Sequence, residues 1–358
     1  MSREFWRDKR VFLTGHTGFK GGWLALWLMD MGAQVHGYAL PPPTEPNFFT
    51  VCGLQAQLST STIADIRDAA SLAQAMHAVR PDIVLHLAAQ SLVRYSYAAP
   101  LETYAVNVMG TANLLEAVRQ TPGVKAVINI TSDKCYENRE WVWPYRENEA
   151  MGGFDPYSSS KGCAELVTAA YRRSYLAPAG IHLASARSGN VIGGGDWATD
   201  RLIPDFLRTV DAGKTLIVRS PQATRPWQHV LEPLAGYLVL AERLASEGGE
   251  YAEAWNFGPQ DAGTRPVQWI VEYLCAQVPR ATWQRDTTPQ PHETNYLKLD
   301  SSKANSRLGW YPRWNLESAL GKTLSWHQAW KQGADMRATS RAQIHDYESG
   351  AAGNRAPA

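Results

Sequence analysis

The sequence has almost no net charge, because its 358 residues include 35 Lys and Arg against 34 Asp and Glu. A chain without excess positive charge has no electrostatic reason to bind nucleic acid or an anionic membrane. The most apolar run, Trp23–Met29, is far shorter than the roughly 20 residues that span a bilayer. The charged segment 1–10 also lacks the apolar core of a signal peptide. These absences predict a cytoplasmic protein with neither nucleic acid nor membrane as its partner.

Cysteine is scarce, and the four that occur are scattered, with no CxxC pair and no His at metal-ligand spacing: Cys52, Cys135, Cys163 and Cys275. A disulfide framework and a structural metal site are therefore not expected. The composition, 44% hydrophobic and 19% charged, also excludes a disordered chain. The length is enough for two domains or one large one.

The first half of the chain alternates short apolar runs with helical patterns, which predicts an α/β fold with a doubly wound parallel sheet. The predicted strands are Val11–Thr14, Gln34–Tyr38, Ser61–Ala64, Ile83–Leu87, Ala126–Thr131 and His182–Ala186. The predicted helices are Gly21–Met31, Ala69–Val79, Leu101–Arg119 and Pro156–Tyr175.

The pattern loosens after residue 186, where Gly, Pro and Trp become frequent. We expect a dinucleotide-binding domain over 1–186, rejoined by part of 225–258, and a smaller substrate-binding domain mainly over 187–335. Residues 348–358 are rich in Gly, Ala, Asn and Pro, which predicts a disordered tail.

Glycines at 15, 18 and 21 stand between the first predicted strand and the first predicted helix. Glycine permits a tight turn and a close approach of backbone to pyrophosphate, and the helix N-terminus offers free N–H groups. The strand–turn–helix context favours a dinucleotide site over a glycine-rich turn that binds nothing.

Tyr157 and Lys161 form a YxxxK pair after Pro156, which is suited to the first position of a helix. Positions i and i+4 share one helix face, so the Lys cation is expected to lower the pKa of the phenol. Such a tyrosine can take a proton from a hydroxyl while hydride leaves the same carbon. The alternative is a surface Tyr and Lys that only support the helix.

The GxxGxxG spacing, the YxxxK pair and Ser132 after an apolar strand resemble the extended short-chain dehydrogenase/reductase family. The resemblance implies a Rossmann-type sheet, NAD as cofactor and no catalytic metal. It places the cofactor on Gly15, Thr17, Gly18, Phe19, Lys20, Gly21, Asp65, Ile66, Leu87, Ala88, Ala89, Thr131, Tyr157 and Lys161. The sequence departs from the NAD-preferring pattern at Tyr38-Ala39-Leu40, where an acid often ends the second strand, and no Arg there indicates NADP.

Ser132-Asp133-Lys134 resembles the nucleotide-sugar 4,6-dehydratase branch of that family, which has Thr-Asp-Glu at these positions. The resemblance implies that Ser132 assists Tyr157 and Lys161 and that Asp133 protonates a departing C6 hydroxyl. Lys134 replaces the usual C5 base. It either acts as that base at a lowered pKa or stays charged and stabilises an enolate, and a lysine that only pairs with Asp133 or Glu137 is the remaining alternative.

Further motifs are similar to the CDP-glucose-specific members of that branch: 185–205, Leu87–Arg94, 131–136, Arg225–Val230 and Leu297–Asp300. The resemblance implies that a nucleotide sugar contacts Gln90, Asn190, Arg201, Arg225 and Tyr296, although each could instead be a salt bridge or a loop anchor. It also implies a homodimer or homotetramer that takes part in deoxysugar synthesis for surface polysaccharide. The alternatives are a dehydratase or 4-epimerase acting on another nucleotide sugar and, remotely, a non-catalytic NAD-binding regulator.

Overall fold

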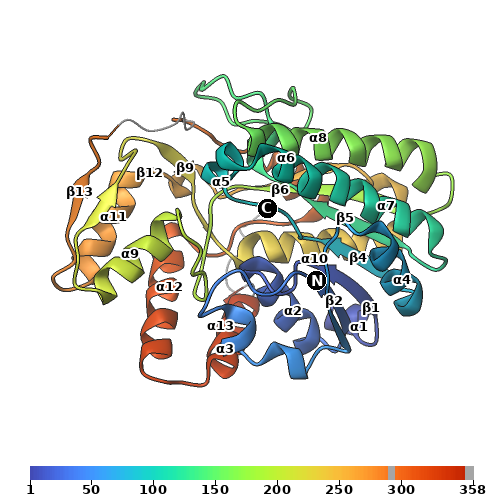
Figure 1. Ribbon diagram of the computed structural model, residues 1–358, viewed down its shortest axis with the longest axis horizontal. Coiled ribbons are helices and arrows are strands. Elements are labelled where there is room, and N and C mark those ends of the chain that lie inside the picture. Colours follow the sequence, from blue (N-terminus) through green and yellow to red (C-terminus); the bar gives the residue numbers. More distant parts are fainter. Residues whose placement is uncertain (289–294, 351–358) are drawn as a thin grey trace.

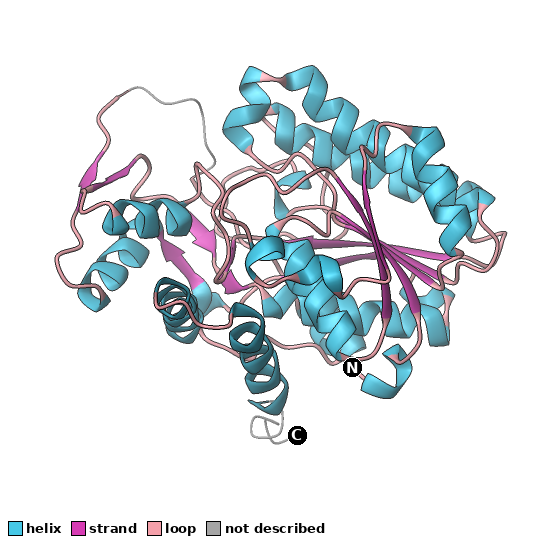
Figure 2. Cartoon of the chain, turned by 60° about the horizontal axis from the view of Figure 1, so that its bottom comes forward, coloured by secondary structure: helices cyan, strands magenta, loops and turns pink. Residues whose placement is uncertain are grey.

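A parallel sheet of seven strands runs through the centre of the molecule. The computed structural model describes residues 1–288 and 295–350. In Figure 2 the strands fan across the larger part of the molecule. Their order is β11 (Ala254–Phe257), β6 (His182–Ser188), β5 (Ala126–Ile130), β4 (Ile83–His86), β1 (Arg10–Thr14), β2 (Gln34–Ala39) and β3 (Thr60–Ile63). This is a Rossmann-type doubly wound sheet.

The central strands are apolar on both faces because helices cover both faces. Side chains of β1, β4 and β5 alternate between two cores: Phe12, Val84 and Val127 face one core, while Leu13, Leu85 and Ile128 face the other. The six predicted strands are confirmed. The seventh strand, β11, was not predicted, because four residues with a central Asn carry too weak a pattern.

Two layers of helices sandwich the sheet (Figure 1). One core lies against α2 (Phe19–Asp30) and α10 (Leu231–Glu247), with α13 (Met336–Ser349) packed on α2. The other lies against α4 (Ala69–Val79), α7 (Gly110–Gln120) and α8 (Pro156–Tyr171). The helix predicted over 101–119 consists of α6 (Pro100–Tyr104), a π-helical segment Ala105–Met109 and α7. Shorter helices precede them: α1 (Arg3–Trp6), α3 (Phe48–Val51) and α5 (Val93–Ala98).

A smaller group of elements with its own apolar core lies to the left in Figure 1. Its helices are α9 (Leu202–Asp211) and α11 (Val267–Gln277), and α12 (Leu316–Lys331) packs beside them. Its strands form short pairs, β8 (Leu216–Val218) with β13 (Trp283–Arg285) and β9 (Thr224–Pro226) with β12 (Thr264–Pro266). A third pair, β7 (Val191–Ile192) with β10 (Gln228–His229), joins this group to the end of β6. Among the described residues, no helix is both long and apolar enough to cross a membrane.

The prediction of a disordered tail from residue 348 is wrong for its first residues. Helix α13 continues to Ser349, and Glu348 accepts hydrogen bonds from Trp27 Nε1 at 2.8 Å and from Arg3 Nη2 at 2.6 Å. These contacts to the N-terminal helices stabilise an end that looks unstructured by composition. The rest of the predicted tail, 351–358, lies outside the described residues.

A buried carboxylate connects α10 to the C-terminal segment. Glu232 accepts hydrogen bonds from Trp314 N at 2.8 Å and from the Tyr347 hydroxyl at 2.6 Å. Burial raises the pKa of Glu232 to about 7, against the opposing effect of these donors. The protonated form is thus favoured in the folded chain well above the ordinary pKa of a glutamate.

This raised pKa predicts that the fold loses stability as pH rises from about 4.5 to about 7. In that window the folded chain holds a proton that the unfolded chain has released, and the loss is at most on the order of 3 kcal/mol. Glu232→Gln should flatten the fall in Tm across this window, measured by calorimetry. Glu272→Gln, at an exposed position of α11, is the matched control and should leave the pH dependence unchanged.

Candidate active site

The glycine-rich turn between β1 and α2 is packed against the turn that follows β4. Gly15 has a φ of +77°, and a Cβ atom there would lie 2.7 Å from Ala88 N. A Cβ atom at Gly21 would lie 2.0 Å from Gly15 O, so α2 approaches the strand too closely for any other residue. Gly18 caps α2, whose first-turn N–H groups lack intrahelical acceptors. The turn therefore fits the pyrophosphate of a dinucleotide.

The turn after β4 is fixed by side chains that also border this site. Leu87 N and Ala88 N each donate to Thr14 Oγ1 at 3.1 Å. Gln90, a predicted substrate residue, donates from Nε2 to Thr103 Oγ1 at 2.9 Å, so its amide already holds α6. Asn107, which the sequence analysis missed, donates to Gln90 O at 2.9 Å and to Ser160 Oγ at 2.8 Å. Ala89 lies within this turn.

Residues of the glycine-rich turn also form hydrogen bonds with β3 and with the residue that follows β2. Thr17 Oγ1 donates to Leu40 O at 2.8 Å, and His16 Nε2 lies 2.8 Å from Ser61 Oγ. The acid that often stands here is absent, as the sequence indicates. Beyond β3, the carboxylate of Asp65 is bound by Arg67 Nε at 2.9 Å, and Ile66 is buried against Gly110. A ligand contacting Asp65 has to share it with Arg67.

Helix α8 presents Tyr157 and Lys161 on one buried face, as predicted. Asp155 caps the helix by accepting a hydrogen bond from Ser158 N at 2.9 Å, and Pro156 occupies its first position. Ser132 stands at the end of β5, close enough to Tyr157 to lower the pKa of the phenol. Ser132 Oγ also lies 3.1 Å from Asp133 Oδ1. Ser132 therefore neighbours both the phenol and the carboxyl group.

The pKa of Tyr157 is not lowered by Lys161 as the sequence predicts. Burial raises the pKa of Tyr157 to about 12, while the neighbouring hydroxyl of Ser132 and the charge of Arg201 lower it. The predicted effect of Lys161 on the phenol is not among these causes. Burial lowers the pKa of Lys161 to about 8, and the neighbouring charge of Lys20 acts in the same direction. The site is dry enough for desolvation to outweigh the interaction between the two side chains.

Asp133 is arranged as a proton donor. Its Oδ2 is buried and has no hydrogen-bond partner in the part of the chain that the structure describes. Burial raises the pKa of the Asp133 carboxyl, although Lys134, Ser132 and Arg225 oppose the rise. A carboxylic acid kept protonated beside a cavity can give its proton to a departing hydroxyl.

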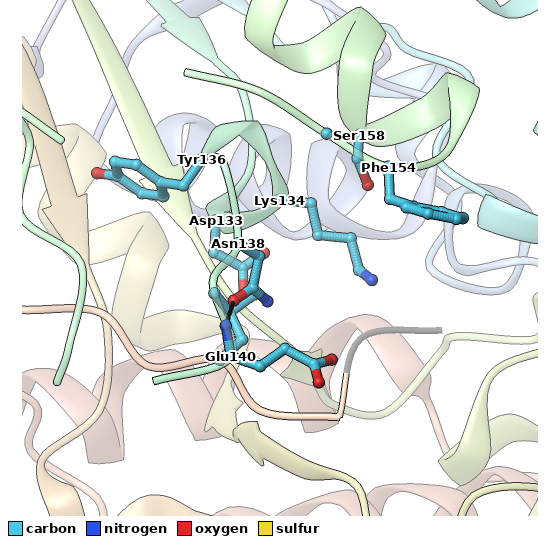
Figure 3. Close-up of a pocket in the computed structure, with 9 residues that line it drawn as sticks. Asp133, Lys134, Tyr136, Asn138, Glu140, Phe154 and Ser158 are labelled. Atoms are coloured by element: carbon cyan, nitrogen blue, oxygen red, sulfur yellow. Dashed lines mark hydrogen bonds between the residues drawn. The ribbon is translucent and has the colours of Figure 1, made fainter. Parts of the chain in front are cut away.

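Asp133 and Lys134 line a cavity of about 160 Å³ together with Tyr136, Asn138, Glu140, Gly153, Phe154, Ser158 and Leu297 (Figure 3). The side chains of Lys134 and Glu140 extend toward the same side of this cavity. Glu140, which the sequence analysis did not select, accepts a hydrogen bond from Asn295 N at 2.6 Å. Asn138 donates to Tyr296 O at 3.0 Å. The loop after the catalytic segment is thus attached to the segment that carries Tyr296.

The predicted substrate residues lie on segments that converge on this site. Arg225 is buried on β9, and its charge acts on Asp133. Tyr296 pairs with Thr224, the residue before Arg225. Arg201 donates to Asp196 Oδ2 and Ser91 Oγ, each at 3.0 Å, and its charge acts on Tyr157. The backbone carbonyl of Asn190 accepts a hydrogen bond from Gln228 N at 3.0 Å.

Three predicted cofactor residues have side chains that contact other parts of the protein. Lys20 Nζ donates to Ser188 Oγ and to the Tyr237 hydroxyl, each at 3.0 Å, on the catalytic side of the glycine-rich turn. Burial lowers the pKa of Lys20 to about 7. Thr131 Oγ1 donates to Glu165 rather than into the cofactor site. Phe19 lies against the 193–195 loop, where its Cζ would be 3.2 Å from a Cβ atom at Gly193.

No group of three or more His, Cys, Asp or Glu side chains within residues 1–288 and 295–350 could hold a metal ion. Three cations act on the carboxyl group of Asp133: Lys20, Lys134 and Arg225. Such a set suits an anionic ligand with phosphate groups.

Comparison with known proteins is consistent with this geometry. The sequence model of the family described as GDP-mannose 4,6 dehydratase matches residues 12–323. The chain is 56% identical to the CDP-glucose 4,6-dehydratase of Salmonella typhimurium, over 98% of this chain and 99% of that protein. It is 26% identical to a dTDP-glucose 4,6-dehydratase of Xanthomonas campestris, over 90% of this chain and 94% of the relative.

Two solved structures share the fold. DesIV, a dTDP-glucose 4,6-dehydratase of Streptomyces venezuelae solved with NAD bound, has a TM-score of 0.76 at 24% identity and covers 92% of this chain and 99% of its own. The UDP-glucose 4-epimerase of Thermotoga maritima also has a TM-score of 0.76, at 22% identity, and covers 89% of this chain and 98% of its own. A dehydratase and an epimerase match equally well, so the fold alone does not choose between these reactions.

The close packing at Gly21 predicts that Gly21→Ala weakens dinucleotide binding. The added methyl group must push α2 away from Gly15, which should weaken NAD+ binding by at least about tenfold and destabilise the fold by about 1–3 kcal/mol. Titration calorimetry with NAD+ and thermal unfolding measure the two effects. Gly321→Ala is the control, because a Cβ atom at Gly321 meets nothing within 4 Å. Unchanged NAD+ affinity in Gly21→Ala would contradict the assignment of the turn.

Proposed function

Because this chain belongs to the GDP-mannose 4,6-dehydratase family of extended short-chain dehydrogenases, we propose that it converts CDP-D-glucose to CDP-4-dehydro-6-deoxy-D-glucose with loss of water. It is a hydro-lyase that uses NAD. The observation that carries the proposal is the buried carboxyl group of Asp133, bound by Ser132 near Tyr157. Its Oδ2 has no hydrogen-bond partner among the described residues. The choice of CDP-glucose is supported by the 56% identity to a CDP-glucose 4,6-dehydratase over nearly the whole of both chains.

The first half of the reaction oxidises C4 of the glucose. When bound, NAD supplies the hydride acceptor for C4 and later the hydride donor for C6. Tyr157 takes the proton of the 4-hydroxyl, and Ser132 forms a hydrogen bond with the same reacting oxygen. Lys161 lies on the same buried face of α8 as Tyr157, and its proposed role is to hold the cofactor beside the phenol.

The second half removes water across C5 and C6. The 4-ketone acidifies the C5 hydrogen, which leaves as a proton. Asp133 gives a proton to the C6 hydroxyl, and the C6–O bond breaks to release water. Hydride then reaches C6 and a proton returns to C5, so the sugar loses one water and the cofactor ends in its starting state. The proton acceptor at C5 is Lys134, or another group in the same cavity with Lys134 as the cation that stabilises the enolate.

Binding of the nucleotide diphosphate is the proposed role of Arg201, Arg225, Asn190 and Tyr296. Arginine guanidinium groups match phosphate oxygens, and an amide donates without adding charge. Arg225 and Tyr296 lie on adjacent segments, one residue out of register. Arg201 is held by Asp196 and Ser91 near Tyr157, close to where the reacting sugar must lie.

A 4-epimerase is the second candidate, because an epimerase of the same fold matches this chain. Asp133 favours dehydration. An epimerase needs no proton donor for the C6 hydroxyl, whereas here burial raises the pKa of a carboxyl group next to Ser132. A regulator without chemistry would have no reason to bury Tyr157, Lys161 and Asp133 at such cost in desolvation.

The assembly proposed for the active protein is a homodimer, or a homotetramer built from it, formed through α8 and the helical run 101–119. Large apolar side chains exposed on these helices support it: Leu101 is 83% exposed, Met109 56% and Leu166 61%. Such side chains are typical of a surface that another subunit covers. The proposed location is the cytoplasm, and the proposed role is deoxysugar synthesis for surface polysaccharide.

The function is tested by incubating the protein with NAD+ and, separately, CDP-, dTDP-, UDP- and GDP-hexoses. We expect CDP-glucose alone to give a product with the alkaline absorbance of a 4-keto sugar and a mass lower by one water. An inverted sugar without loss of mass would indicate the epimerase. Turnover of dTDP-glucose but not CDP-glucose would contradict the nucleotide assignment, and binding without turnover of any hexose would indicate the regulator.

The mechanism predicts that substitutions at Asp133 and Lys134 stop different steps, the loss of water and the exchange of the C5 hydrogen. Asp133→Asn should lower the rate of water loss by about 10² to 10⁴, because the proton donor is gone. Exchange of the C5 hydrogen with solvent should continue, since oxidation at C4 does not need Asp133. Lys134→Met should abolish that exchange. Mass spectrometry of the sugar nucleotide recovered from D2O measures both.

Glu140→Gln separates the two roles of Lys134. If Lys134 is the base, exchange survives in Glu140→Gln; if Glu140 is the base, exchange is lost in both variants. Asp335→Asn, which alters only the cap of α13, is the control and should keep full activity. Full-rate dehydration in Asp133→Asn would contradict the acid role.

A further inference from the structure

A fully buried ion pair lies beneath the catalytic side chains. Arg187 on β6 donates from Nη2 to Glu165 Oε2 at 2.8 Å and from Nε to Glu165 Oε1 at 2.9 Å, which makes a two-point fork. Each side chain is 4% exposed. Although burial favours the neutral acid, Arg187 and the surrounding donors hold the pKa of Glu165 below its ordinary value. Both partners are therefore charged in the folded protein.

This pair contacts each segment that carries a catalytic residue. Glu165 stands on α8, one helical turn after Lys161 and two turns after Tyr157. It accepts hydrogen bonds from Thr131, the residue before Ser132, and from Ser185 Oγ at 2.6 Å. Arg187 Nη1 donates to the Tyr136 hydroxyl at 2.7 Å. Thr131 and Tyr136 are the two ends of the segment that holds Ser132, Asp133 and Lys134.

A second contact fixes the distance between α8 and the segment 131–136. Gly162 of α8 faces the backbone of this segment, and a Cβ atom there would lie 3.3 Å from Cys135 O and 2.8 Å from Gly152 O. The helix thus approaches the catalytic segment to within backbone contact. The ion pair and the glycine together leave little freedom for α8 to slide.

A buried ion pair is a poor device for stability alone, because well-packed apolar side chains of similar volume often stabilise as well or better. Its advantage is geometry. The planar guanidinium fixes both the distance and the angle to the carboxylate, whereas apolar contacts permit sliding. Tyr157 and Lys161 act at C4, while Asp133 and Lys134 act at C6 and C5, so the reaction needs two rigid bodies held at one separation.

We propose that Glu165 and Arg187 are positioning residues that set the separation between the C4-oxidising face of α8 and the dehydrating segment 132–134. The inference rests on the proposed function. It predicts that loss of the fork uncouples the two halves of the reaction, because each half keeps its own residues on its own element while their relative placement changes.

The test uses single-turnover kinetics with NAD+ and CDP-glucose in the full-length protein. The neutral double variant Glu165→Gln/Arg187→Met avoids a lone buried charge, and Arg187→Lys keeps the charge but loses the fork. We expect C4 oxidation to remain within about threefold of the wild type while water loss slows by at least about thirtyfold, as a misplacement near 1 Å can produce. The absorbance of the reduced nicotinamide should then accumulate transiently, and the KM for CDP-glucose should change little.

Two further variants separate positioning from general destabilisation. Gly162→Ala changes the same separation without changing charge and should give the same transient accumulation. Asp30→Asn removes another buried carboxylate, which binds Arg3, Arg341 and His345 far from the site, and should lower Tm while leaving both rates unchanged.

Slowing of both halves in equal ratio, or full activity in Arg187→Lys and the double variant, would overturn the positioning role. Wild-type protein that fails to turn over CDP-glucose would instead overturn the proposed function, and this inference with it. A folded variant is established beforehand by its thermal unfolding transition, and Arg187→Lys provides a folded protein if the double variant unfolds.

Discussion

The chemistry of this protein depends on desolvation around one hydroxyl group. Ser132 donates a hydrogen bond to Asp133 and lowers the pKa of the Tyr157 phenol, and all three side chains are buried. Burial alone moves the pKa of both acidic groups upward. For Asp133 that direction is useful, since a proton donor must hold its proton at working pH. For Tyr157 it is a cost, which the neighbouring hydroxyl of Ser132 and the charge of Arg201 offset in part. A single dry environment therefore serves two groups with opposite tasks.

The sheet makes this environment possible by bringing distant segments to one edge. The carboxyl ends of β1, β4, β5 and β6 carry, in turn, the glycine-rich turn, the turn at Leu87, Ser132 and the approach to Asn190. Parallel strands place all four at the same edge, which is where open α/β sheets bind ligands. The smaller group of elements then adds Arg225 and Tyr296 from the opposite side. Neither body could surround a nucleotide sugar without the other.

Local patterns in the sequence predict the parts of the site that depend on local structure. The strand–turn–helix around Gly15 and Gly21 and the shared face of Tyr157 and Lys161 follow from spacing, and both are present. The direction of Lys20, the burial that governs Tyr157 and the partnership of Glu165 with Arg187 depend on contacts between residues far apart in the chain. The helical end at Glu348 could not be predicted for the same reason, since its partners Trp27 and Arg3 are more than 300 positions away. Only the Tyr157, Lys161 and Glu165 spacing gave a local hint that a third residue belonged to that face.

The attachment of the 138–145 loop to the segment at 295–300 has a consequence for exchanging parts between relatives. Asn138 and Glu140 bind the backbone at Tyr296 and Asn295, and Tyr145 pairs with Leu299. These contacts are backbone-directed, so they specify register rather than side-chain identity. A chimaera that takes only one of the two segments from a relative would lose these contacts, because each segment supplies one half of every pair. Grafts intended to retarget the enzyme to a different nucleotide therefore have to move both segments together, although Glu140 and Asn295 are 155 positions apart in the chain.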